Sequence, residues 1–365
     1  MNSFPFEITD VVRILNLSLR RKKYSSWDLD CPFCGRKGKL NINLLKDAYR
    51  CNACSECGGM LKLYADLEGT TQSQAYKAIN DIVNDEGNNK ANGKSYSQNS
   101  KDKMSKEIMK PLEPALLQSR HKVYSIMIDY LTLSPEHENK LLDRGLEASD
   151  IQLGCYRSVK TNDISSLFMQ LREYELDLRG VPGFYTTDGI WKINFPYWAK
   201  GILIPIKSVD ELISGFQIRL DKPIDNMKYT WFSSTDLESG TSSGSPVHFV
   251  GDTSAKTVYV TEGALKANIA HSVTGWTFLA VPGANQYKAL ATELRQLKSF
   301  GFETVVEAYD IDKHTNIHVE KGCRNMMKMA DSLGFNVRRL KWDEQYKGID
   351  DYVDAKKCFR REKHA

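Results

Sequence analysis

The sequence has no apolar run that approaches the roughly 18 residues of a membrane-spanning helix. Its first residues form neither a basic start nor an apolar stretch, so we expect no secretion signal and no membrane partner. Strong charge of one sign is missing too, because 50 Lys and Arg residues face 46 Asp and Glu residues, a net charge of +4. If the protein binds nucleic acid, the basic residues that do so must therefore be concentrated in one part of its surface. Together these absences predict a cytoplasmic protein.

Large apolar residues are almost absent from residues 85–107, which are rich in Asn, Lys, Ser and Gly. Such a stretch cannot bury a core, and we expect a flexible linker. The whole chain is 41% hydrophobic and 26% charged, as globular proteins are, and 365 residues allow two or three domains. We therefore predict domains at residues 1–84, 108–255 and 256–365.

Four cysteines form two C-x2-C pairs, Cys31 with Cys34 and Cys51 with Cys54. In a reducing cytosol, clustered cysteines bind metal more often than they form disulfides, and this spacing suits a tetrahedral zinc site. A fifth cysteine, Cys57, is an alternative to Cys54 as the fourth ligand. Structural zinc is therefore the first cofactor that the sequence predicts.

Residues 40–44 and 48–50 alternate between apolar and polar side chains, as the two strands of a hairpin do. With the cysteines, this hairpin predicts a small zinc ribbon. Ahead of it lies the basic run of residues 20–23, followed closely by Tyr24 and Trp27. Cations and aromatic rings together suit single-stranded DNA, although a solvated charge run beside core aromatics explains them equally well.

Two apolar, strand-like runs end in carboxylates. Residues 257–263 include Glu262, and residues 304–312 include Asp310 and Asp312. The carboxyl ends of parallel strands face the crevice in which α/β sheets bind ligands, so we expect the three carboxylates to converge. They would repel one another without a hard cation, which predicts Mg²⁺ or Mn²⁺ as a second cofactor.

The region around these carboxylates alternates strands and helices from residue 256 to about 355. This rhythm predicts an α/β fold with a parallel sheet flanked by helices on both faces. The region before it, residues 108–255, is predicted to be α+β. It begins with short helices, and strand-like runs follow at residues 201–206, 215–220 and 228–232. Glu307 lies one residue out of phase with the acidic pair, and we expect it to be structural.

The two halves resemble known domains. Residues 5–82 resemble the zinc-binding domain of bacterial and phage primases, through the Cys-Pro-Phe-Cys pair, the second pair and the Gly58-Gly59 turn that follows it. Residues 256–355 resemble the Toprim domain, through Glu262-Gly263 and the aspartate pair. In this order the two resemble DnaG-type DNA primases, including those of phages and mobile elements.

The resemblance implies a nucleotidyltransferase of the DNA-directed RNA polymerase type. It would synthesise short RNA primers on a single-stranded DNA template from ribonucleoside triphosphates, with a replicative helicase as a further partner. The chain ends about ten residues after the Toprim region, where host primases continue, so we expect a phage, plasmid or mobile-element variety. Its setting would be the cytoplasm of a bacterial or phage-infected cell.

The resemblance also assigns roles to residues. The metal site would consist of Glu262, Asp310, Asp312 and Asp350, and the template and nucleotide phosphates would meet Arg219, Lys228, Lys200 and Arg157. Glu262 is alternatively a general base. In the Toprim region the chain departs from the family at three positions: aspartate is common where this chain has Lys266 and Gly348, and glycine where it has Ile311. These departures leave the number of catalytic metals open.

Two other functions fit parts of the sequence. A Toprim-type nuclease would share the acidic residues. However, the nucleases of the overcoming-lysogenisation type also carry an ATPase domain, and this sequence has no phosphate-binding loop that would indicate one. A RecR-like recombination mediator also joins a zinc motif to a Toprim fold and binds DNA without catalysis. It is much shorter and lacks the block of residues 215–228.

Overall fold

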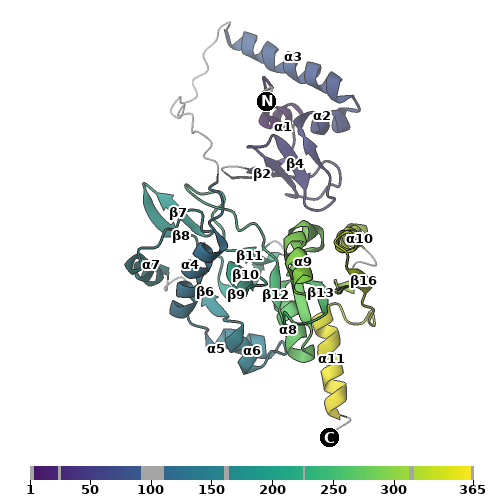
Figure 1. Ribbon diagram of the computed structural model, residues 1–365. Coiled ribbons are helices and arrows are strands. Elements are labelled where there is room, and N and C mark those ends of the chain that lie inside the picture. The colour runs from purple at the N-terminus through teal and green to yellow at the C-terminus, as the bar shows by residue number, and fades with distance from the viewer. Residues whose placement is uncertain are drawn as a thin grey trace. The chain divides into compact units, whose positions relative to one another are not determined.

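A computed structural model describes residues 4–23, 26–91, 111–159, 164–224, 227–311 and 316–362 (Figure 1). The chain divides into two compact units, Met1–Lys110 and Pro111–Ala365. Among the described helices, none combines the length and the apolar character that crossing a membrane requires.

The first unit is built on a five-stranded antiparallel sheet in sequence order. Its strands are β1 (Leu19–Lys22), β2 (Ser26–Leu29), β3 (Leu40–Asn43), β4 (Ala48–Cys51) and β5 (Cys57–Gly59), and its helices are α1 (Ile8–Ile14), α2 (Met60–Glu68) and α3 (Gln72–Ala91). The predicted hairpin is β3 with β4, with Leu40 opposite Cys51. Leu40 and Ile42 point into the core beside Leu63 of α2, which is why this strand alternates.

The second unit begins with four helices and an antiparallel sheet in the order β11-β10-β9-β6. The elements are α4 (Leu117–Tyr130), α5 (Pro135–Leu142), α6 (Ala148–Leu153), β6 (Arg157–Val159), α7 (Ile164–Glu173), β9 (Gly201–Lys207), β10 (Ile213–Ile224) and β11 (Met227–Trp231), with a separate hairpin of β7 (Phe184–Thr187) and β8 (Ile190–Ile193). The strands β9, β10 and β11 lie where the sequence predicts them.

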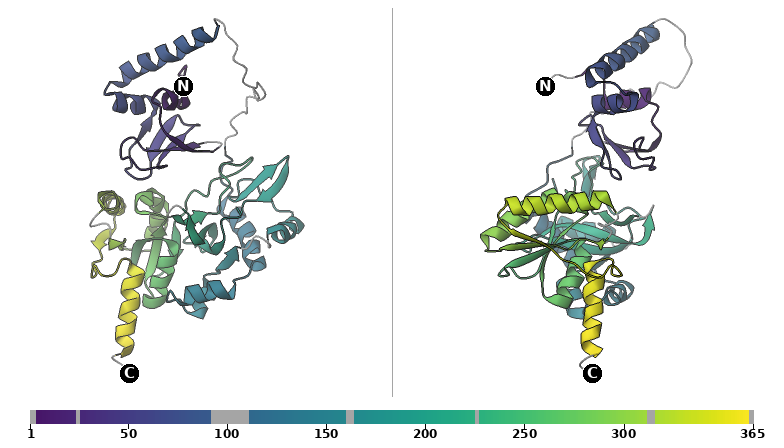
Figure 2. Two further views of the ribbon diagram at one scale, coloured as in Figure 1. Left: turned by 180° about the vertical axis from the view of Figure 1, so that it is seen from behind. Right: turned by 90° about the vertical axis from the view of Figure 1, so that its right-hand side faces the viewer.

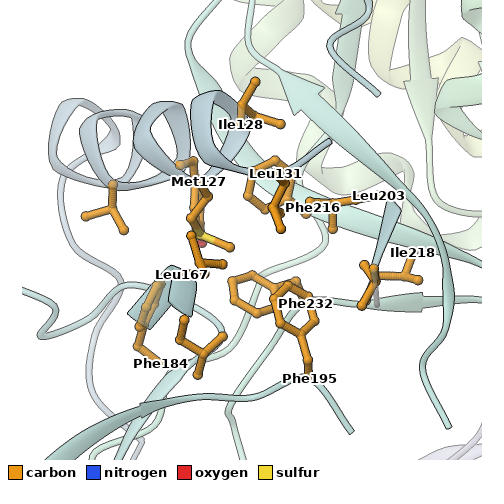
Figure 3. Packing of buried hydrophobic residues seen from close by; sticks show 14 of the residues in the cluster. Met127, Ile128, Leu131, Leu167, Phe184, Phe195, Leu203, Phe216, Ile218 and Phe232 are labelled. Atoms are coloured by element: carbon orange, nitrogen blue, oxygen red, sulfur yellow. The ribbon is translucent and has the colours of Figure 1, made fainter. Parts of the chain in front are cut away.

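An aromatic core holds this sheet against α4 and the hairpin (Figure 3). Phe232, which is fully buried, stacks on Phe195 with ring centroids 4.6 Å apart and meets Phe184 edge to face at 5.9 Å. Tyr124 of α4 packs on Phe216 of β10 at 4.7 Å. Such pairs add specific geometry to the burial of large rings, and they fix the orientation of β10.

The second unit ends in a five-stranded sheet in the order β12-β14-β13-β15-β16. Its strands are β12 (His248–Val250), β13 (Thr257–Glu262), β14 (Thr277–Val281), β15 (Thr304–Glu307) and β16 (Asn336–Arg339). The pairs β13–β14, β13–β15 and β15–β16 are parallel, as predicted. The edge strand β12 pairs with β14 in the antiparallel direction, which the sequence did not predict.

Helices cover both faces of this sheet, as the right-hand view of Figure 2 shows. They are α8 (Ala264–Thr274), the short helix η2 (Ala284–Ala289), α9 (Leu290–Ser299), α10 (Ile317–Ser332) and α11 (Ile349–Glu362). Val258 and Val260 belong to one core with Leu294 of α9, whereas Tyr259 packs in another with Ala267 of α8. Alternate residues of the central strand thus serve opposite faces.

The connections make β13 the centre of the sheet. From β13 the chain runs through α8 to β14 on one side, and then through α9 to β15 on the other side. The strand order therefore reverses between β13 and β15. In open α/β sheets, ligands bind beyond the carboxyl ends of the strands at such a point. Glu262 and Asp310 both lie there, at the end of β13 and directly after β15.

Candidate functional site

The four cysteines of the predicted zinc site gather at one point of the first unit. The ligand sulfurs of Cys31, Cys34, Cys51 and Cys54 all lie within 4.8 Å of one another. The distances from Cys31 Sγ to Cys54 Sγ and from Cys34 Sγ to Cys51 Sγ are both 3.8 Å. A tetrahedral zinc ion with Zn–S bonds of about 2.3 Å has sulfur–sulfur edges of about 3.8 Å, so the arrangement fits zinc.

Both cysteine pairs use the same backbone turn. The N–H of Cys31 donates to the carbonyl of Arg36 and the N–H of Gly35 to that of Cys31. The second pair repeats this pattern twenty positions later, through the N–H groups of Cys51 and Ser55. Gly35 and Ser55 both adopt positive φ, at 69° and 62°, because each turn must reverse sharply behind its cysteine.

Cys57 lies outside the cluster. It is exposed on β5, opposite Arg50 of β4, and is not among the four clustered sulfurs. Of the two alternatives for the fourth ligand, the geometry supports Cys54.

The predicted basic run forms β1, an exposed edge strand of the sheet. Arg20 is held by Asp30 in a bidentate pair, with N–O distances of 2.8 and 2.6 Å, while Lys22 lies 4.7 Å from the centroid of the Trp27 ring. Tyr24 is outside the described residues. A basic edge strand also discourages pairing with other chains, so its position alone does not choose between the two explanations.

Two of the three predicted catalytic carboxylates, Glu262 and Asp310, lie around the ends of β13 and β15. Glu262 and Val281 are partners in the β13–β14 register, and the backbone N–H of Ala284 donates to Glu262 Oε2 at 3.2 Å. Gly263, with φ of 87°, turns the chain sharply into α8. Asp310 is 8% exposed and lies shortly after the end of the neighbouring strand β15, which ends at Glu307. Asp312 is outside the described residues.

A lysine lies among these carboxylates. Lys266 Nζ of α8 donates to both carboxylate oxygens of Asp310. Burial alone lowers the pKa of Lys266, but the charge and hydrogen bonds of Asp310 outweigh burial and leave that pKa raised. Lys266 is therefore an ammonium that is paired with one of the predicted metal ligands.

Asp350 joins the same cluster from the first turn of α11. The loop before α11 is held by the N–H of Ile311, which donates to the carbonyl of Lys347 at 2.9 Å. Arg144 Nη2 contacts Asp350 Oδ2 at 3.2 Å. Burial raises the pKa of the Asp350 carboxyl, and the charge of Lys266 opposes that effect. Its other oxygen, Oδ1, is buried without a hydrogen-bond partner in the described part of the chain.

The cluster has the right donors for a hard cation, because carboxylate oxygens are the ligands of Mg²⁺ and Mn²⁺ and one buried oxygen of Asp350 has no partner among the described residues. The described carboxylates are less closely gathered than the sequence predicted. Glu262, Asp310 and Asp350 do not form a set of ligand atoms within 4.8 Å of one another in the described part of the chain. In the described part of the chain, Asp310 is therefore engaged by the Lys266 ammonium and is not gathered with Glu262 and Asp350 into one ligand set.

Arg144 is a residue that the sequence analysis missed as a functional candidate. It lines a cavity of about 290 Å³ together with Arg219, Lys140 and Asp143. Through its contact with Asp350, it links this cavity to the carboxylate cluster. The sequence signal for Arg144 was the helix end Arg144-Gly145-Leu146, which resembles that of the primase core; Gly145 has a φ of 92° there.

The four predicted phosphate-binding residues do not converge. Arg219 faces the cavity and contacts the hydroxyl of Tyr229, its partner across β10 and β11, at 3.2 Å. Lys228 directly precedes Tyr229, so it projects from the opposite face of β11. Lys200 is exposed ahead of β9, and Arg157 donates to the carbonyl of Ile128 at 2.7 Å and to that of Tyr156 at 2.8 Å.

Comparisons with known proteins identify the fold. The crystal structure of the zinc-binding and RNA polymerase domains of the Aquifex aeolicus primase is similar over 99% of this chain and 85% of that chain, at 17% identity and a TM-score of 0.52. The RNA polymerase domain of Mycobacterium tuberculosis primase DnaG is similar over 67% of this chain and 82% of that chain, at 15% identity and a TM-score of 0.50.

The sequence comparisons are less informative. The family described as "Domain of unknown function (DUF3854)" matches residues 248–358, which begin at β12. No curated protein matches the chain by sequence. The structural likeness therefore carries the result: the chain has the fold of primase zinc-binding and RNA polymerase domains, which confirms the predicted resemblance at the level of the fold.

Proposed function

We propose that the protein is a DNA primase that synthesises short RNA primers on single-stranded DNA from ribonucleoside triphosphates. One observation carries the proposal: Glu262 and Asp310 lie at neighbouring strand ends where the strand order reverses, with Asp350 packed against the same loop. A polar site at this place on a polymerase-like fold is suited to phosphoryl transfer, which depends on positioning and charge stabilisation.

The carboxylates would hold the catalytic ion, through Glu262, Asp310, Asp312 and Asp350. When bound, Mg²⁺ or Mn²⁺ supplies charge stabilisation at the triphosphate and at the attacking hydroxyl. Glu262 is alternatively the general base for that hydroxyl. The N–H of Ala284 fixes the orientation of the Glu262 carboxylate in either role.

Arg219 and Arg144 would bind phosphates of the template or of the incoming nucleotide. They line one cavity, and a guanidinium offers phosphate two parallel hydrogen bonds. Lys140 on the cavity wall is already bonded to Glu136 and Asp221, at 2.8 and 3.0 Å, so we assign it a lesser role. Lys228 and Lys200 are placed for longer-range attraction of nucleic acid from other faces.

The zinc unit would engage the template. Its exposed strand β1 carries Arg21 and Lys22, and Lys22 lies over the ring of Trp27 on β2; such mixtures of cations and rings suit single strands. The four-cysteine ribbon would act here as a rigid support, since the four thiolates leave no open coordination position for chemistry.

A primer-synthesis assay tests the proposal. The full chain is incubated with single-stranded DNA, labelled ribonucleotides and Mg²⁺ or Mn²⁺, and we expect short labelled products. Asp310→Asn should lower their yield by about a hundredfold or more, the scale of losing a preorganised charge at such a site. Asp331→Asn is the matched control, because this exposed aspartate lies at the far end of α10.

The assay also has outcomes that would refute the proposal. Cleavage of the DNA in the absence of nucleotides would indicate a Toprim-type nuclease. DNA binding that survives Asp310→Asn, with no chemistry under any condition, would indicate a RecR-like mediator.

A further inference from the structure

Asp221 is a carboxylate on the wall of the cavity that Arg144 and Arg219 also line. We propose that Asp221 accepts a hydrogen bond from the 2′-hydroxyl of a bound nucleotide and so selects ribonucleotides over 2′-deoxyribonucleotides. The inference rests on the proposed function for one point only, that the arginines of this cavity bind nucleotide phosphate.

The strand β10 sets the spacing between Asp221 and Arg219. The two residues are two positions apart, so their side chains leave the same face of the strand about 6.6 Å from each other. Leu220, which lies between them, belongs to the aromatic core on the other face. The N–H of Asp221 donates to the carbonyl of Lys200 at 3.0 Å, which continues the pairing of β10 with β9 past Leu220. The carboxylate is therefore carried by a regular, hydrogen-bonded strand.

Two residues of α5 hold one oxygen of this carboxylate. His137 Nε2–H donates to Asp221 Oδ1 at 2.9 Å, and Lys140 Nζ donates to the same oxygen at 3.0 Å. His137 is only 5% exposed, and its Nδ1 shares a hydrogen bond of 2.7 Å with Ser158 Oγ, which fixes the ring. Among the described residues, Asp221 Oδ2 has no hydrogen-bond partner. The contacts within the protein thus orient Asp221 and leave its second oxygen for a ligand.

Asp221 is ionised at neutral pH. Burial raises the pKa of its carboxyl group, but the contacts with Lys140 and His137 outweigh burial and leave that pKa lowered. A carboxylate only accepts hydrogen bonds, and it repels a phosphate. In this cavity Asp221 can therefore stabilise only a part of the ligand that donates a hydrogen bond.

The part of a nucleotide that meets this condition is its sugar. A guanidinium binds phosphate through two parallel hydrogen bonds, which places the phosphate at the arginine end of the cavity. The sugar is bonded directly to the phosphate, whereas the amino groups of the bases lie beyond the sugar. The cavity holds about 290 Å³, near the lower end of small-molecule sites at about 300–1,000 Å³, so it suits part of one nucleotide.

The 2′-hydroxyl is the lasting donor of that sugar. The 3′ oxygen becomes esterified when the chain grows and then has no proton to donate, whereas the 2′-hydroxyl keeps its proton throughout. It is also the group by which a protein distinguishes RNA from DNA. An acceptor that is fixed before the ligand arrives favours the ligand that carries this hydroxyl.

Asp143 is a second carboxylate on the cavity wall and provides a matched control. It follows α5 as its C-cap residue and is exposed. Among the described residues, no side chain bonds to its carboxylate. It brings the same charge to the cavity as Asp221 without being held in one orientation, and fixing it on binding would cost side-chain entropy.

Calorimetric titration of the full, zinc-loaded chain with ATP and with 2′-deoxyATP, each with Mg²⁺, tests the inference without DNA or primer synthesis. We expect the wild type to bind ATP about tenfold or more tightly than 2′-deoxyATP, the scale of one hydrogen bond to a charged group. 3′-DeoxyATP should bind as ATP does. Asp221→Asn should bind ATP and 2′-deoxyATP within about threefold of each other, because a neutral amide is a weaker acceptor.

Three further variants control for charge and for a structural effect. Asp143→Asn should keep the preference for ATP. His137→Leu removes a donor that orients Asp221 and should lower the preference, whereas His137→Gln, whose amide can donate from nearly the same place, should retain most of it. A purely structural role of His137 would weaken the binding of both nucleotides and leave their ratio unchanged. Circular dichroism and zinc content establish that each variant is folded, and the His137 variants carry the test if Asp221→Asn does not fold.

The inference is overturned if the wild type binds ATP and 2′-deoxyATP equally or binds neither. It is equally overturned if only 3′-deoxyATP is rejected, or if Asp143→Asn removes the preference and Asp221→Asn retains it. If the preference depends on Asp221 but the wild type makes no primers, the inference stands and the proposed function fails.

Discussion

At the scale of single residues, the second unit buries several ionisable groups, and each has a defined partner. Glu307 is fully buried at the end of β15 and pairs with Arg339 of β16 at 2.5 Å, which agrees with the structural role that its position in the strand predicted. His248 is buried on β12, where its Nε2–H donates to Asn268 Oδ1 at 2.8 Å and its Nδ1 accepts from the backbone N–H of Lys207 at 3.0 Å. These bonds require a neutral imidazole.

Burial makes His248 a source of acid sensitivity, because it lowers the pKa of the imidazole to about 4. In the unfolded chain that pKa is about 6.5, so between these values only the unfolded state binds the proton. Stability is therefore lost as pH falls below about 6.5, by about 3 kcal/mol once pH reaches 4. Urea unfolding at pH 7 and 4.5 should show this loss in the wild type and a much smaller one in His248→Gln.

His248→Gln should itself be less stable than the wild type at pH 7, since its bonds are imperfectly replaced. The pH dependence is the decisive quantity: an equal loss in both proteins would contradict the role assigned to His248.

At the scale of elements, the contact between β9 and β10 positions Arg219. Gly201 faces Leu220 across the two strands, and a Cβ atom at this position would lie 1.9 Å from the carbonyl oxygen of Arg219. The strands can therefore pair in this register only because residue 201 has no side chain.

Gly201→Ala should force the two strands apart and lower the free energy of unfolding by about 1–3 kcal/mol, as overpacking does. Because Arg219 moves with its carbonyl, nucleotide binding should weaken as well. Urea unfolding measures the first effect. Gly283→Ala is the control for stability, since a Cβ atom there meets nothing within 4 Å; similar losses in both variants would contradict the proposed clash.

Most of the elements were predictable, because buried strands and amphipathic helices repeat their apolar residues with a clear period. Residues 257–262 and 304–307 are β13 and β15, as their apolar runs indicated. The strand β1 was not predicted, because all four of its residues are exposed and it has no apolar pattern. The strand β12 has only three residues, too few for a periodic signal.

The carboxylate cluster was predictable in position but not in detail. Strand ends identify Glu262 and Asp310, whereas the pairing of Lys266 with Asp310 spans 44 positions and that of Arg144 with Asp350 spans 206. No local pattern encodes such contacts, since they depend on how β13, β15 and α11 come together. Arg219 and Lys228 were both predicted to bind phosphates, but they project from opposite faces of the sheet. The pairing of β10 with β11 decides this, and no local sequence pattern encodes that register.

At the scale of the whole molecule, the two units have separate cores. The core of the first unit consists of residues 6–79 around the cysteine cluster, and the cores of the second are formed by residues 123–353. A small zinc ribbon depends on its metal for stability, because metal-binding free energy is also folding free energy.

Zinc removal should therefore unfold only one unit. With a strong chelator, we expect the thermal transition of the first unit to disappear and that of the second to remain, as measured by calorimetry and by proteolysis between the units. Cys34→Ser should have the same effect, and Cys57→Ser should retain one zinc ion per chain. Loss of both transitions together, or loss of zinc in Cys57→Ser, would contradict this view.

The Lys266–Asp310 pair also distinguishes the two units by the source of the positive charge beside their clustered anions. The cysteine ribbon depends on an ion from outside, because four thiolates brought this close together repel one another unless a cation binds between them. The second unit brings its own positive charge to Asp310, on a helix that forms in the same stretch of chain as Glu262. The second unit therefore carries in its own sequence a positive charge of the kind that the first unit takes from solution.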